Sequence, residues 1–331
     1  MNLPLALRIL LWPLSLVYGA YVRVRRAVYA RRWLKSRRLK AMVISVGNLT
    51  VGGTGKTPMV LWLAEKFLGE GKNVAILSRG YRGTNGSSDE VELLKRRLGD
   101  RVLFGVGPDR FRCGSRLECA NGVDVFLLDD GFQHLQLARD LDIVMLDGSR
   151  EIKNEWLLPA GPLREPVAAC RRADILVVSR KSGRPLIEAK DTDKFSIFYA
   201  QTRLLGFRRF GSDSRQKYLS ELGAGRFVAF CGIGNPNAFF EDLSLWRVSV
   251  AEKKAFPDHH KYSAGELEQL QVRGEACGAA GLITTEKDAE NLPQANPRLP
   301  IWIAVIDFVF TAESELLAAI DRKLATRGVA A

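Results

Sequence analysis

Residues 47–57 read GNLTVGGTGKT, and they directly follow the run MVISV at residues 42–46. The earlier run is short and rich in apolar and β-branched residues, as expected of a buried parallel strand. Gly52, Gly53 and Gly55 let the following loop turn tightly and point its N–H groups inward. The strand and the glycine loop together predict a cradle for phosphate groups.

Three other residues of this stretch add to the predicted chemistry. Thr54 lies between the glycines, Lys56 supplies a positive charge, and the hydroxyl of Thr57 can ligate Mg²⁺. A helix that begins here adds a dipole that favours anions. The usual pattern has glycine where Thr50 stands. Strand context and the Gly-Lys-Thr ending nevertheless favour a nucleotide triphosphate site over an ordinary glycine-rich turn.

The length and composition indicate a folded protein of about two domains. The chain has 331 residues, of which 47% are hydrophobic, and this content excludes a disordered chain. The five cysteines show no close pairing, so neither a zinc site nor a disulfide framework is expected. This cysteine usage fits a reducing, cytosolic compartment.

The net charge of +12 is unevenly distributed along the chain. Residues 1–40 contain ten Lys or Arg and no acid, whereas the rest carries 39 basic and 37 acidic side chains. The body of the protein is therefore close to neutral. A basic surface of the kind that binds nucleic acid is not indicated, and we expect no nucleic-acid partner.

The segment 1–40 has the composition of a membrane-contacting helix. No residue from Ile9 to Val22 is charged, but fourteen residues are fewer than the roughly 20 that span a bilayer. The main basic cluster follows the apolar run, whereas a signal peptide places its charge before it. We therefore expect a helix that lies in the interface, with its basic residues on anionic lipid. The alternative is a helix that packs on the body.

The rest of the chain has the pattern of an α/β protein. Apolar spacing predicts a helix over residues 55–70. Short apolar runs predict strands at 73–78, 102–106, 125–128, 141–146 and 175–179. Strands that are apolar on both faces imply a parallel sheet covered by helices, here a mostly parallel core like that of P-loop NTPases.

A second, smaller α/β unit is expected toward the C-terminus. Residues 203–216 are polar and basic, after which strands are predicted at 226–231, 281–284 and 301–305. The sequence Gly-Ile-Gly at 232–234 resembles half of a dinucleotide fingerprint, but a strand-to-helix turn explains it better. The expected division is 1–40 for the membrane-interface helix, 41–205 for the P-loop core and 206–331 for the C-terminal unit.

Two carboxylates follow the predicted strand at 125–128. Asp129 and Asp130 stand where a buried parallel strand can deliver an acid to Mg²⁺ beside the phosphate loop. Paired acids can also simply start a turn. Together with Lys56 and Thr57, the metal role is favoured, and residues 131–134 (GFQH) would lie beside the same site.

Two further candidates lie later in the chain. Arg164 belongs to LLPAGPLREP at 157–166, a proline-stiffened segment that suits charge stabilisation of a transferring phosphoryl group. The alternative is a surface turn with a solvated arginine. His259 belongs to PDHH at 257–260, where an exposed loop histidine is the ordinary explanation, although closure of the two domains over a nucleotide would bring this loop to the cleft.

The positions of lysine residues argue against two other classes of P-loop protein. Partition-type ATPases would need a lysine where Val51 stands. GTPases read guanine with Asn/Thr-Lys-x-Asp, whereas TEKD at 285–288 has its lysine one place late. Both classes are disfavoured.

Several motifs together resemble the tetraacyldisaccharide 4′-kinases of lipid A synthesis, a family of P-loop kinases. The resemblance runs in order from the N-terminal helix to about residue 290. The matching stretches are VGNLTVGGTGKTP at 46–58, SRGY at 78–81, LDDGFQH at 128–134, LPAGPLREP at 158–166, FPDH at 256–259 and TEKD at 285–288.

The resemblance implies transfer of the ATP γ-phosphate to the 4′-hydroxyl of a tetraacylated, 1-phosphorylated glucosamine disaccharide. The partners would be this acylated lipid and, through residues 1–40, the cytoplasmic face of the bacterial inner membrane. The implied cofactors are ATP and Mg²⁺. The main alternative is a membrane-attached ATPase switch that acts on protein partners, and a nucleic-acid-dependent ATPase is a third reading.

The resemblance also implies roles for single residues. Lys56 would hold the β- and γ-phosphates, and Thr57 and Asp130 would ligate Mg²⁺ with Asp129 beside them. Arg164 would stabilise the transition state.

The resemblance places the general base with less direct support. The family's base lies in a Gly-Asp-Glu-Pro motif and is oriented by the histidine that matches His259. The nearest match here is SDEV at 88–91, so Asp89 inherits the role. The segment before it is shorter than is usual in the family.

Overall fold

The structure of the chain is a computed structural model. It describes residues 4–80, 88–149, 152, 155–179, 195–212, 216–223, 225–294 and 296–328. The helices are α1 (Leu5–Ala30), α2 (Lys56–Gly69), α3 (Asp89–Leu98), α4 (Arg110–Asn121), α5 (Pro236–Leu245), α6 (Ala264–Ala276), α7 (Glu286–Ala289) and α8 (Glu313–Gly328). The strands are β1 (Met42–Asn48), β2 (Val74–Ser78), β3 (Leu103–Val106), β4 (Val125–Asp129), β5 (Leu141–Asp147), β6 (Ile175–Ser179), β7 (Ser196–Arg209), β8 (Phe227–Cys231), β9 (Val250–Ala255), β10 (Gly281–Thr285) and β11 (Ile301–Phe310).

The chain divides into two compact units. The first contains residues 1–87, 97–201 and 309–331, and the second contains residues 88–96 and 202–308. This differs from the expected linear division into 41–205 and 206–331. The reason is that β7 and β11 each run through both units, so the chain returns to the first unit near its end, while most of α3 belongs to the second.

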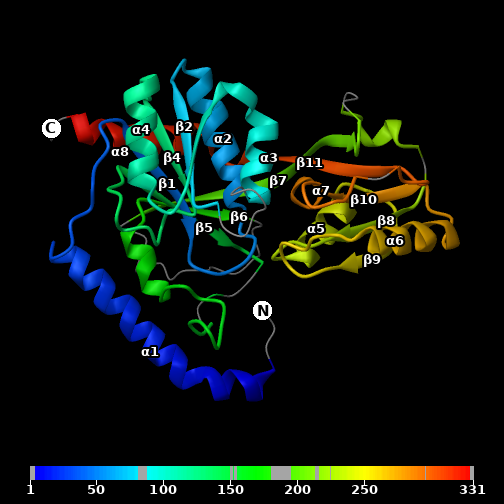
Figure 1. The fold of residues 1–331 in the computed structure, drawn as a ribbon, viewed down its shortest axis with the longest axis horizontal. Helices are drawn as coiled ribbons and strands as arrows, with labels where there is room; N and C mark the ends of the chain where they lie inside the picture. Colours follow the sequence, from blue (N-terminus) through cyan, green and yellow to red (C-terminus); the bar gives the residue numbers. More distant parts are fainter. Residues whose placement is uncertain are drawn as a thin grey trace. The chain divides into compact units, whose positions relative to one another are not determined.

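The first unit is built on parallel strands in the order β3-β2-β4-β1-β5-β6-β7. Strand β1 lies between β4 and β5, with Val46 opposite Asp129 and Ile143 in the register. The interior strands β1, β4, β5 and β6 are almost wholly buried. Their continuous apolar runs are what a sheet covered on both faces requires. The predicted mostly parallel core is confirmed, and its strands can be followed in Figure 1.

Helices α2 and α4 cover strands of this sheet. Helix α2 contacts β1, β2 and β4 through a buried face, and α4 contacts β2 and β3 (Figure 1). Helix α4 begins with Asp109 as its cap, because the Asp109 carboxylate accepts from the Arg112 N–H, and it ends at Gly122 in a left-handed conformation. The C-terminal helix α8 contacts β5.

The strands of the second unit belong to the same sheet and follow the order β7-β11-β10-β8-β9. Strand β10 pairs in parallel with β8 and β11, and β8 pairs in parallel with β9. Strands β7 and β11 are antiparallel. Two hydrogen bonds show this: the Phe210 N–H donates to the carbonyl of Ile301, and the Thr311 N–H donates to that of Tyr199. Helix α5 contacts β8 and β9, and α6 contacts β8 and β10.

Two strands were not expected from the sequence. Strand β7 covers residues 196–209, where exposed and buried positions mix and only the second half, from residue 203, is basic. Strand β9 lies at an edge and exposes Lys253 and Lys254, a common way to protect a sheet edge. Strand β9 lacks the apolar run by which buried strands are recognised, whereas β7 contains a short one, IFYA at 197–200, that sequence reasoning did not single out.

Helix α1 is longer than the uncharged run within it and packs along the first unit. It has 26 residues, and its length and composition would suffice to cross a membrane. One stripe of the helix, Ser15, Gly19 and Val22, is nevertheless buried against the protein. Apolar side chains elsewhere on α1 are exposed, among them Leu10 at 73% and Val17 at 68%. The helix therefore has one face packed on the protein and one exposed apolar face.

Gly47 in β1 generates a stability prediction. A Cβ at Gly47 would lie 2.5 Å from the Cβ of Phe132 and 2.7 Å from its backbone nitrogen, so we expect Gly47→Ala to lower the free energy of unfolding by about 1–3 kcal/mol. Gly69, at the end of α2, has no atom within 4 Å of such a Cβ and is the matched control. Chemical denaturation of both variants tests this, and equal stability of the two would contradict it.

Candidate nucleotide and acid-base sites

The predicted phosphate loop connects β1 to α2. Gly52 and Gly55 have φ values of 108° and 87°, which glycine adopts without strain. Gly55 caps α2, whose first two residues are Lys56 and Thr57. The loop therefore ends at the N-terminus of a 14-residue helix, which is the arrangement that binds phosphate groups.

Hydrogen bonds fix the middle of this loop. The Asn48 side-chain amide donates to the Thr54 hydroxyl at 3.1 Å. The carbonyl of Thr54 accepts from the hydroxyl of Ser179, at the end of β6, at 3.2 Å. Thr54 itself is buried. Thr54 thus anchors the loop to the ends of two strands, β1 and β6.

Asp130 brings the two predicted cations together. Its carboxylate oxygens accept from the Arg164 guanidinium at 2.7 and 2.8 Å, and Oδ1 lies 3.7 Å from Lys56 Nζ. Burial alone would raise the pKa of Asp130, but the charges of Lys56 and Arg164 outweigh it and hold the pKa at about 2. Asp130 is therefore fully ionised at neutral pH.

The Arg164 segment is hydrogen-bonded to the phosphate loop. The Arg164 N–H donates to the carbonyl of Leu49 at 2.7 Å, and the Val51 N–H donates to that of Pro162 at 2.8 Å. Gln133 donates to the carbonyl of Asn48 at 3.0 Å. These contacts keep Arg164 beside the loop rather than in a solvated surface turn.

Helix α1 also contacts the Arg164 segment. The Tyr18 hydroxyl donates to the carbonyl of Arg164, and the Ser15 hydroxyl donates to that of Leu157, both at 2.9 Å. Arg25 donates to the carbonyl of Gln133 at 3.0 Å. The helix with the exposed apolar face is thus in direct contact with two segments of the candidate site.

Asp129 and His134 flank Asp130 in different environments. Asp129 ends β4 and is 3% exposed, and its carbonyl accepts from the buried Arg110 at 3.3 Å. Burial, together with the charges of Arg110, Arg139 and Arg25, lowers the pKa of His134 to about 4. His134 is therefore neutral at physiological pH.

The donor set suits Mg²⁺ better than a metal held by protein alone. Within the described ranges, no three or more His, Cys, Asp or Glu side chains come together as a metal cage. A hydroxyl at Thr57 and ionised carboxylates are hard oxygen ligands. Mg²⁺ ordinarily takes one or two such ligands and completes its shell with water and substrate phosphates. The residues present therefore fit Mg²⁺ bound together with a nucleotide.

A separate acid-base pair lies in the second unit. His259 Nδ1 lies 2.9 and 3.1 Å from the Asp89 carboxylate oxygens, although 170 residues separate the two. The Asn291 side chain also donates to Asp89, at 3.2 Å. Burial alone would raise the pKa of Asp89. The hydrogen bond from His259 and the charge of Lys287 outweigh burial, so the pKa lies below its ordinary value of 3.8. The hydrogen bond to Asp89 raises the pKa of His259 above 6.5.

A buried carboxylate supports the His259 loop. The Asp288 carboxylate accepts from the Gly232 N–H at 2.7 Å, the Tyr262 hydroxyl at 2.8 Å and the Thr285 hydroxyl at 2.6 Å. The carbonyl of Gly232 in turn accepts from the His259 N–H at 3.1 Å. This network holds the backbone of His259 in a left-handed conformation, with φ of 60°, which residues other than glycine rarely adopt.

The predicted site residues thus form two groups. Lys56, Asp130 and Arg164 meet at the phosphate loop of the first unit, and Asp89 meets His259 in the second. Sequence reasoning did not single out Arg110 or Asn291. Arg110 looked like an ordinary helix residue, and Asn291 is 202 residues from its partner, so neither gave a local signal.

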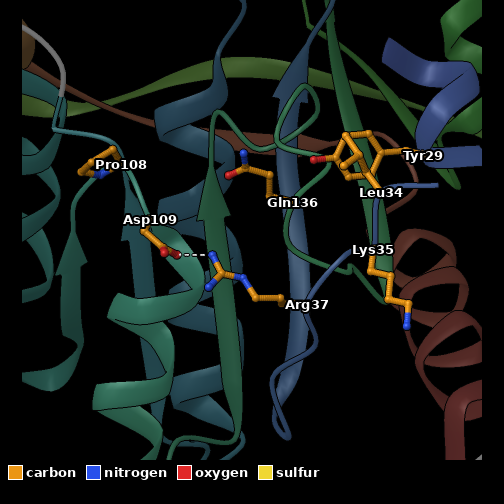
Figure 2. A pocket seen from close by; sticks show the side chains of 7 residues that line it. All are labelled: Tyr29, Leu34, Lys35, Arg37, Pro108, Asp109 and Gln136. Atoms are coloured by element: carbon orange, nitrogen blue, oxygen red, sulfur yellow. Dashed lines mark hydrogen bonds and ion pairs between the residues drawn. The ribbon is translucent and has the colours of Figure 1, made fainter. Parts of the chain in front are cut away.

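The structure also contains an open surface pocket of about 510 Å³ at the C-terminal end of α1, shown in Figure 2. Arg37 and Asp109 form an ion pair at 2.8 Å within it, and the Lys35 side chain extends away from that pair. The other lining residues are Tyr29, Leu34, Pro108 and Gln136. None of the predicted site residues lines this pocket.

Comparison with known proteins gives matches along nearly the whole chain. The family described as LpxK, tetraacyldisaccharide-1-P 4′-kinase, matches residues 7–325. A tetraacyldisaccharide 4′-kinase of Geobacter metallireducens is 38% identical over 335 residues, which cover 95% of this chain and 98% of the relative. The corresponding protein of Halothermothrix orenii is 34% identical, with 85% and 83% covered.

A solved structure agrees with these matches. LpxK from Aquifex aeolicus, crystallised in complex with ATP, superposes with a TM-score of 0.76 at 30% identity, and the match covers 96% of this chain and 99% of that one. The shared fold and the matched length lead to one assignment. The chain belongs to the tetraacyldisaccharide-1-P 4′-kinase family.

Proposed function

We propose that the protein transfers the γ-phosphate of ATP to the 4′-hydroxyl of a tetraacylated glucosamine disaccharide 1-phosphate, which yields lipid IVA in lipid A biosynthesis. The family match over residues 7–325 supports this activity. The observation that carries the proposal is the meeting of the Asp130 carboxylate with Lys56 and Arg164 beside the phosphate loop.

The first unit would bind and polarise the nucleotide. The loop N–H groups from Gly52 to Thr57 would hold the phosphates at the start of α2. Thr57, Asp129 and Asp130 would hold Mg²⁺, which neutralises negative charge on the phosphate oxygens when bound. Lys56 and Arg164 would add positive charge where it develops in the loose transition state of phosphoryl transfer.

Asp89 would act as the general base. The acceptor oxygen attacks the γ-phosphorus while the bond from that phosphorus to the β,γ-bridging oxygen breaks. ADP leaves with the electron pair, and the hydroxyl proton passes to the Asp89 carboxylate. The proposal is supported by the hydrogen bonds from His259 and Asn291, which orient this carboxylate in its ionised form.

The exposed face of α1 would bring the enzyme to its lipid substrate. Leu10, Val17 and their exposed apolar neighbours suit the boundary between headgroups and acyl chains. Basic residues such as Lys35, at the pocket at the end of α1, would meet anionic headgroups. Because ATP is supplied in the cytoplasm, we place the enzyme on the cytoplasmic face of the inner membrane.

A direct assay tests the activity. Detergent-solubilised protein is incubated with ATP, Mg²⁺ and the disaccharide lipid, and the product is analysed by mass spectrometry. We expect one added phosphate, on the sugar that carries the 4′-hydroxyl. Phosphate release that needs no lipid acceptor but is stimulated by a protein partner would instead favour an ATPase switch.

Substitution of Asp89 tests the general base. We expect Asp89→Asn to lower kcat by about 10²- to 10⁴-fold, because the carboxamide cannot accept the proton, while ATP affinity is kept. The control is Glu92→Gln, an exposed acid on the same helix. Steady-state kinetics and ATP titration measure both effects, and near-normal turnover of the Asn variant would remove Asp89 from the mechanism.

The Asp89–His259 pair also predicts a pH-dependent stability. Because the pKa of Asp89 is lowered in the folded protein, Asp89 contributes stability that is present above pH 3.8 and is lost as the pH falls through the folded-state pKa. Because the pKa of His259 is raised in the folded protein, His259 contributes stability that is fully present below pH 6.5 and is lost as the pH rises through the folded-state pKa. Urea denaturation should therefore show a larger stability deficit for His259→Gln at pH 5.5 than at pH 8.5. A deficit that is equal at both pH values, or larger at 8.5, would be inconsistent with this pairing.

Charged substitutions on α1 test membrane contact. We expect Leu10→Glu and Val17→Glu to reduce binding to phosphatidylethanolamine–phosphatidylglycerol vesicles several-fold, because a carboxylate is costly to bury at the apolar boundary. Leu245→Glu is the control, since Leu245 is 77% exposed but lies on α5 in the second unit. Vesicle sedimentation measures binding. Unchanged binding of both α1 variants would show that this face does not contact lipid.

A further inference from the structure

Helix α1 approaches the segment that carries Arg164, residues 157–166, very closely. Its buried residues Ser15, Gly19 and Val22 are four and three positions apart, so they share one face of the helix. A Cβ at Gly19 would lie 2.8 Å from Cδ1 of Leu157, a distance that ordinary packing does not allow. The helix backbone therefore rests directly on the start of the Arg164 segment.

Two hydroxyl groups of α1 bond this segment at three points. The Ser15 hydroxyl donates to the carbonyl of Leu157 at 2.9 Å and accepts from the Ala160 N–H at 3.0 Å. The Tyr18 hydroxyl donates to the carbonyl of Arg164 at 2.9 Å. Burial raises the pKa of the Tyr18 hydroxyl above its ordinary value of 10, so the group keeps the proton that it donates.

The segment is a closed turn that links these contacts to the phosphate loop. The Leu163 N–H donates to the carbonyl of Trp156 at 3.0 Å, and the Leu158 N–H donates to that of Leu163 at 2.9 Å, so the two ends of the turn are tied together. The Arg164 N–H donates to Leu49 in the phosphate loop, at 2.7 Å. The peptide groups of Arg164 are thus held by the phosphate loop through the N–H and by α1 through the carbonyl.

We propose that Ser15 and Tyr18 are positioning residues, through which α1 holds the Arg164 segment against the phosphate loop and so aims the Arg164 guanidinium. The inference rests on the proposed role of Arg164 in the transition state. In this scheme neither hydroxyl touches the nucleotide or the lipid. The helix that meets the membrane also sets the position of a cation in the phosphoryl-transfer site.

The two functions of α1 use different side chains. Ser15 is 5% exposed and bonds backbone groups, whereas the residues assigned to lipid contact, such as Leu10 and Val17, are mostly exposed. A helix that only anchors the protein needs no buried hydroxyl, because a buried polar group is costly unless it is hydrogen-bonded. Positioning and membrane binding can therefore be separated by substitution.

Other contacts keep α1 on the first unit when both hydroxyls are removed. Arg8 pairs with Glu155 at 3.2 Å, and Arg25 donates to the carbonyl of Gln133 at 3.0 Å. A variant with Ser15→Ala and Tyr18→Phe keeps these contacts and the apolar surface of the helix. It loses the three hydrogen bonds to the Arg164 segment.

Kinetics in detergent test the positioning role. We expect the double variant Ser15→Ala, Tyr18→Phe to lower kcat about 10- to 100-fold, because a displacement of roughly 1 Å in a positioned group has an effect of this size. The KM for ATP and binding to phosphatidylethanolamine–phosphatidylglycerol vesicles should not change. The control is Tyr21→Phe, the same chemical change at a tyrosine of α1 that is 61% exposed, and it should leave kcat unchanged. A normal kcat of the double variant, or a loss confined to vesicle binding, would overturn the proposal.

A double-mutant cycle tests whether the hydroxyl acts through Arg164. We expect Tyr18→Phe to lower kcat in the wild-type background but to change it less than about 2-fold in Arg164→Ala, because coupled residues are not additive. If Tyr18→Phe slows both enzymes by the same factor, the hydroxyl acts elsewhere and the proposal is wrong.

Amide hydrogen exchange of the substrate-free protein gives a readout that needs no activity. Peptides that cover residues 157–165 should exchange slowly in the wild type and in Tyr21→Phe. They should exchange about 10-fold faster in the double variant, as expected for the loss of a hydrogen bond. Rapid exchange of these amides in the wild type would overturn the proposal whether or not any variant folds.

The exchange result separates this inference from the proposed function. Absence of phosphoryl transfer in the wild type, with slow exchange at 157–165, would refute the proposed function and leave the hold of α1 on the segment intact. Transfer by the wild type, together with an unchanged kcat of the double variant, would refute the positioning role alone.

Discussion

The first unit depends on one carboxylate that is held between two cations. Asp130 adopts a left-handed conformation, with φ of 49°, which costs an aspartate on the order of 1 kcal/mol or more. The conformation turns its carboxylate toward Arg164 and Lys56, and those charges keep it ionised. Three segments must meet for this to occur: the phosphate loop, the turn after β4 and the loop that carries Arg164. The parallel sheet makes that possible, since the carboxyl ends of neighbouring strands lie at one edge.

The second unit also orients a carboxylate, but by a different set of contacts. Its base candidate, Asp89, is oriented by hydrogen bonds from distant parts of the chain rather than by a metal site. The support is the buried Asp288, whose carboxylate fixes Gly232 and through it the His259 loop. In both units a strained backbone position, at Asp130 or His259, is stabilised by hydrogen bonds to the surrounding loops.

Much of the candidate nucleotide site could be predicted from the sequence, because its signals are local. The apolar run at 42–46, the glycines after it and the acids after 125–128 each specify an element and its end, and the parallel sheet then places them together. Asp89 was identified by family resemblance, and its contact with His259 spans 170 residues that no periodicity connects. Lys287 and Asn291 act through contacts of the same kind. Strand β9 was missed because charged residues interrupt it, and β7 was missed because its apolar run at 197–200 is short and is followed by a polar and basic stretch. The division into units differs from the expected one because β7 and β11 belong to both units.

The central claim is that a magnesium-bound triphosphate occupies the start of α2, beside Asp130. A crystal structure with Mg²⁺ and a non-hydrolysable ATP analogue tests it most directly. We expect the β- and γ-phosphates to contact Lys56 and the loop N–H groups, with the metal on Thr57 and Asp130. An analogue bound away from residues 52–57, with Asp130 still paired to Arg164 and no metal beside it, would contradict the account.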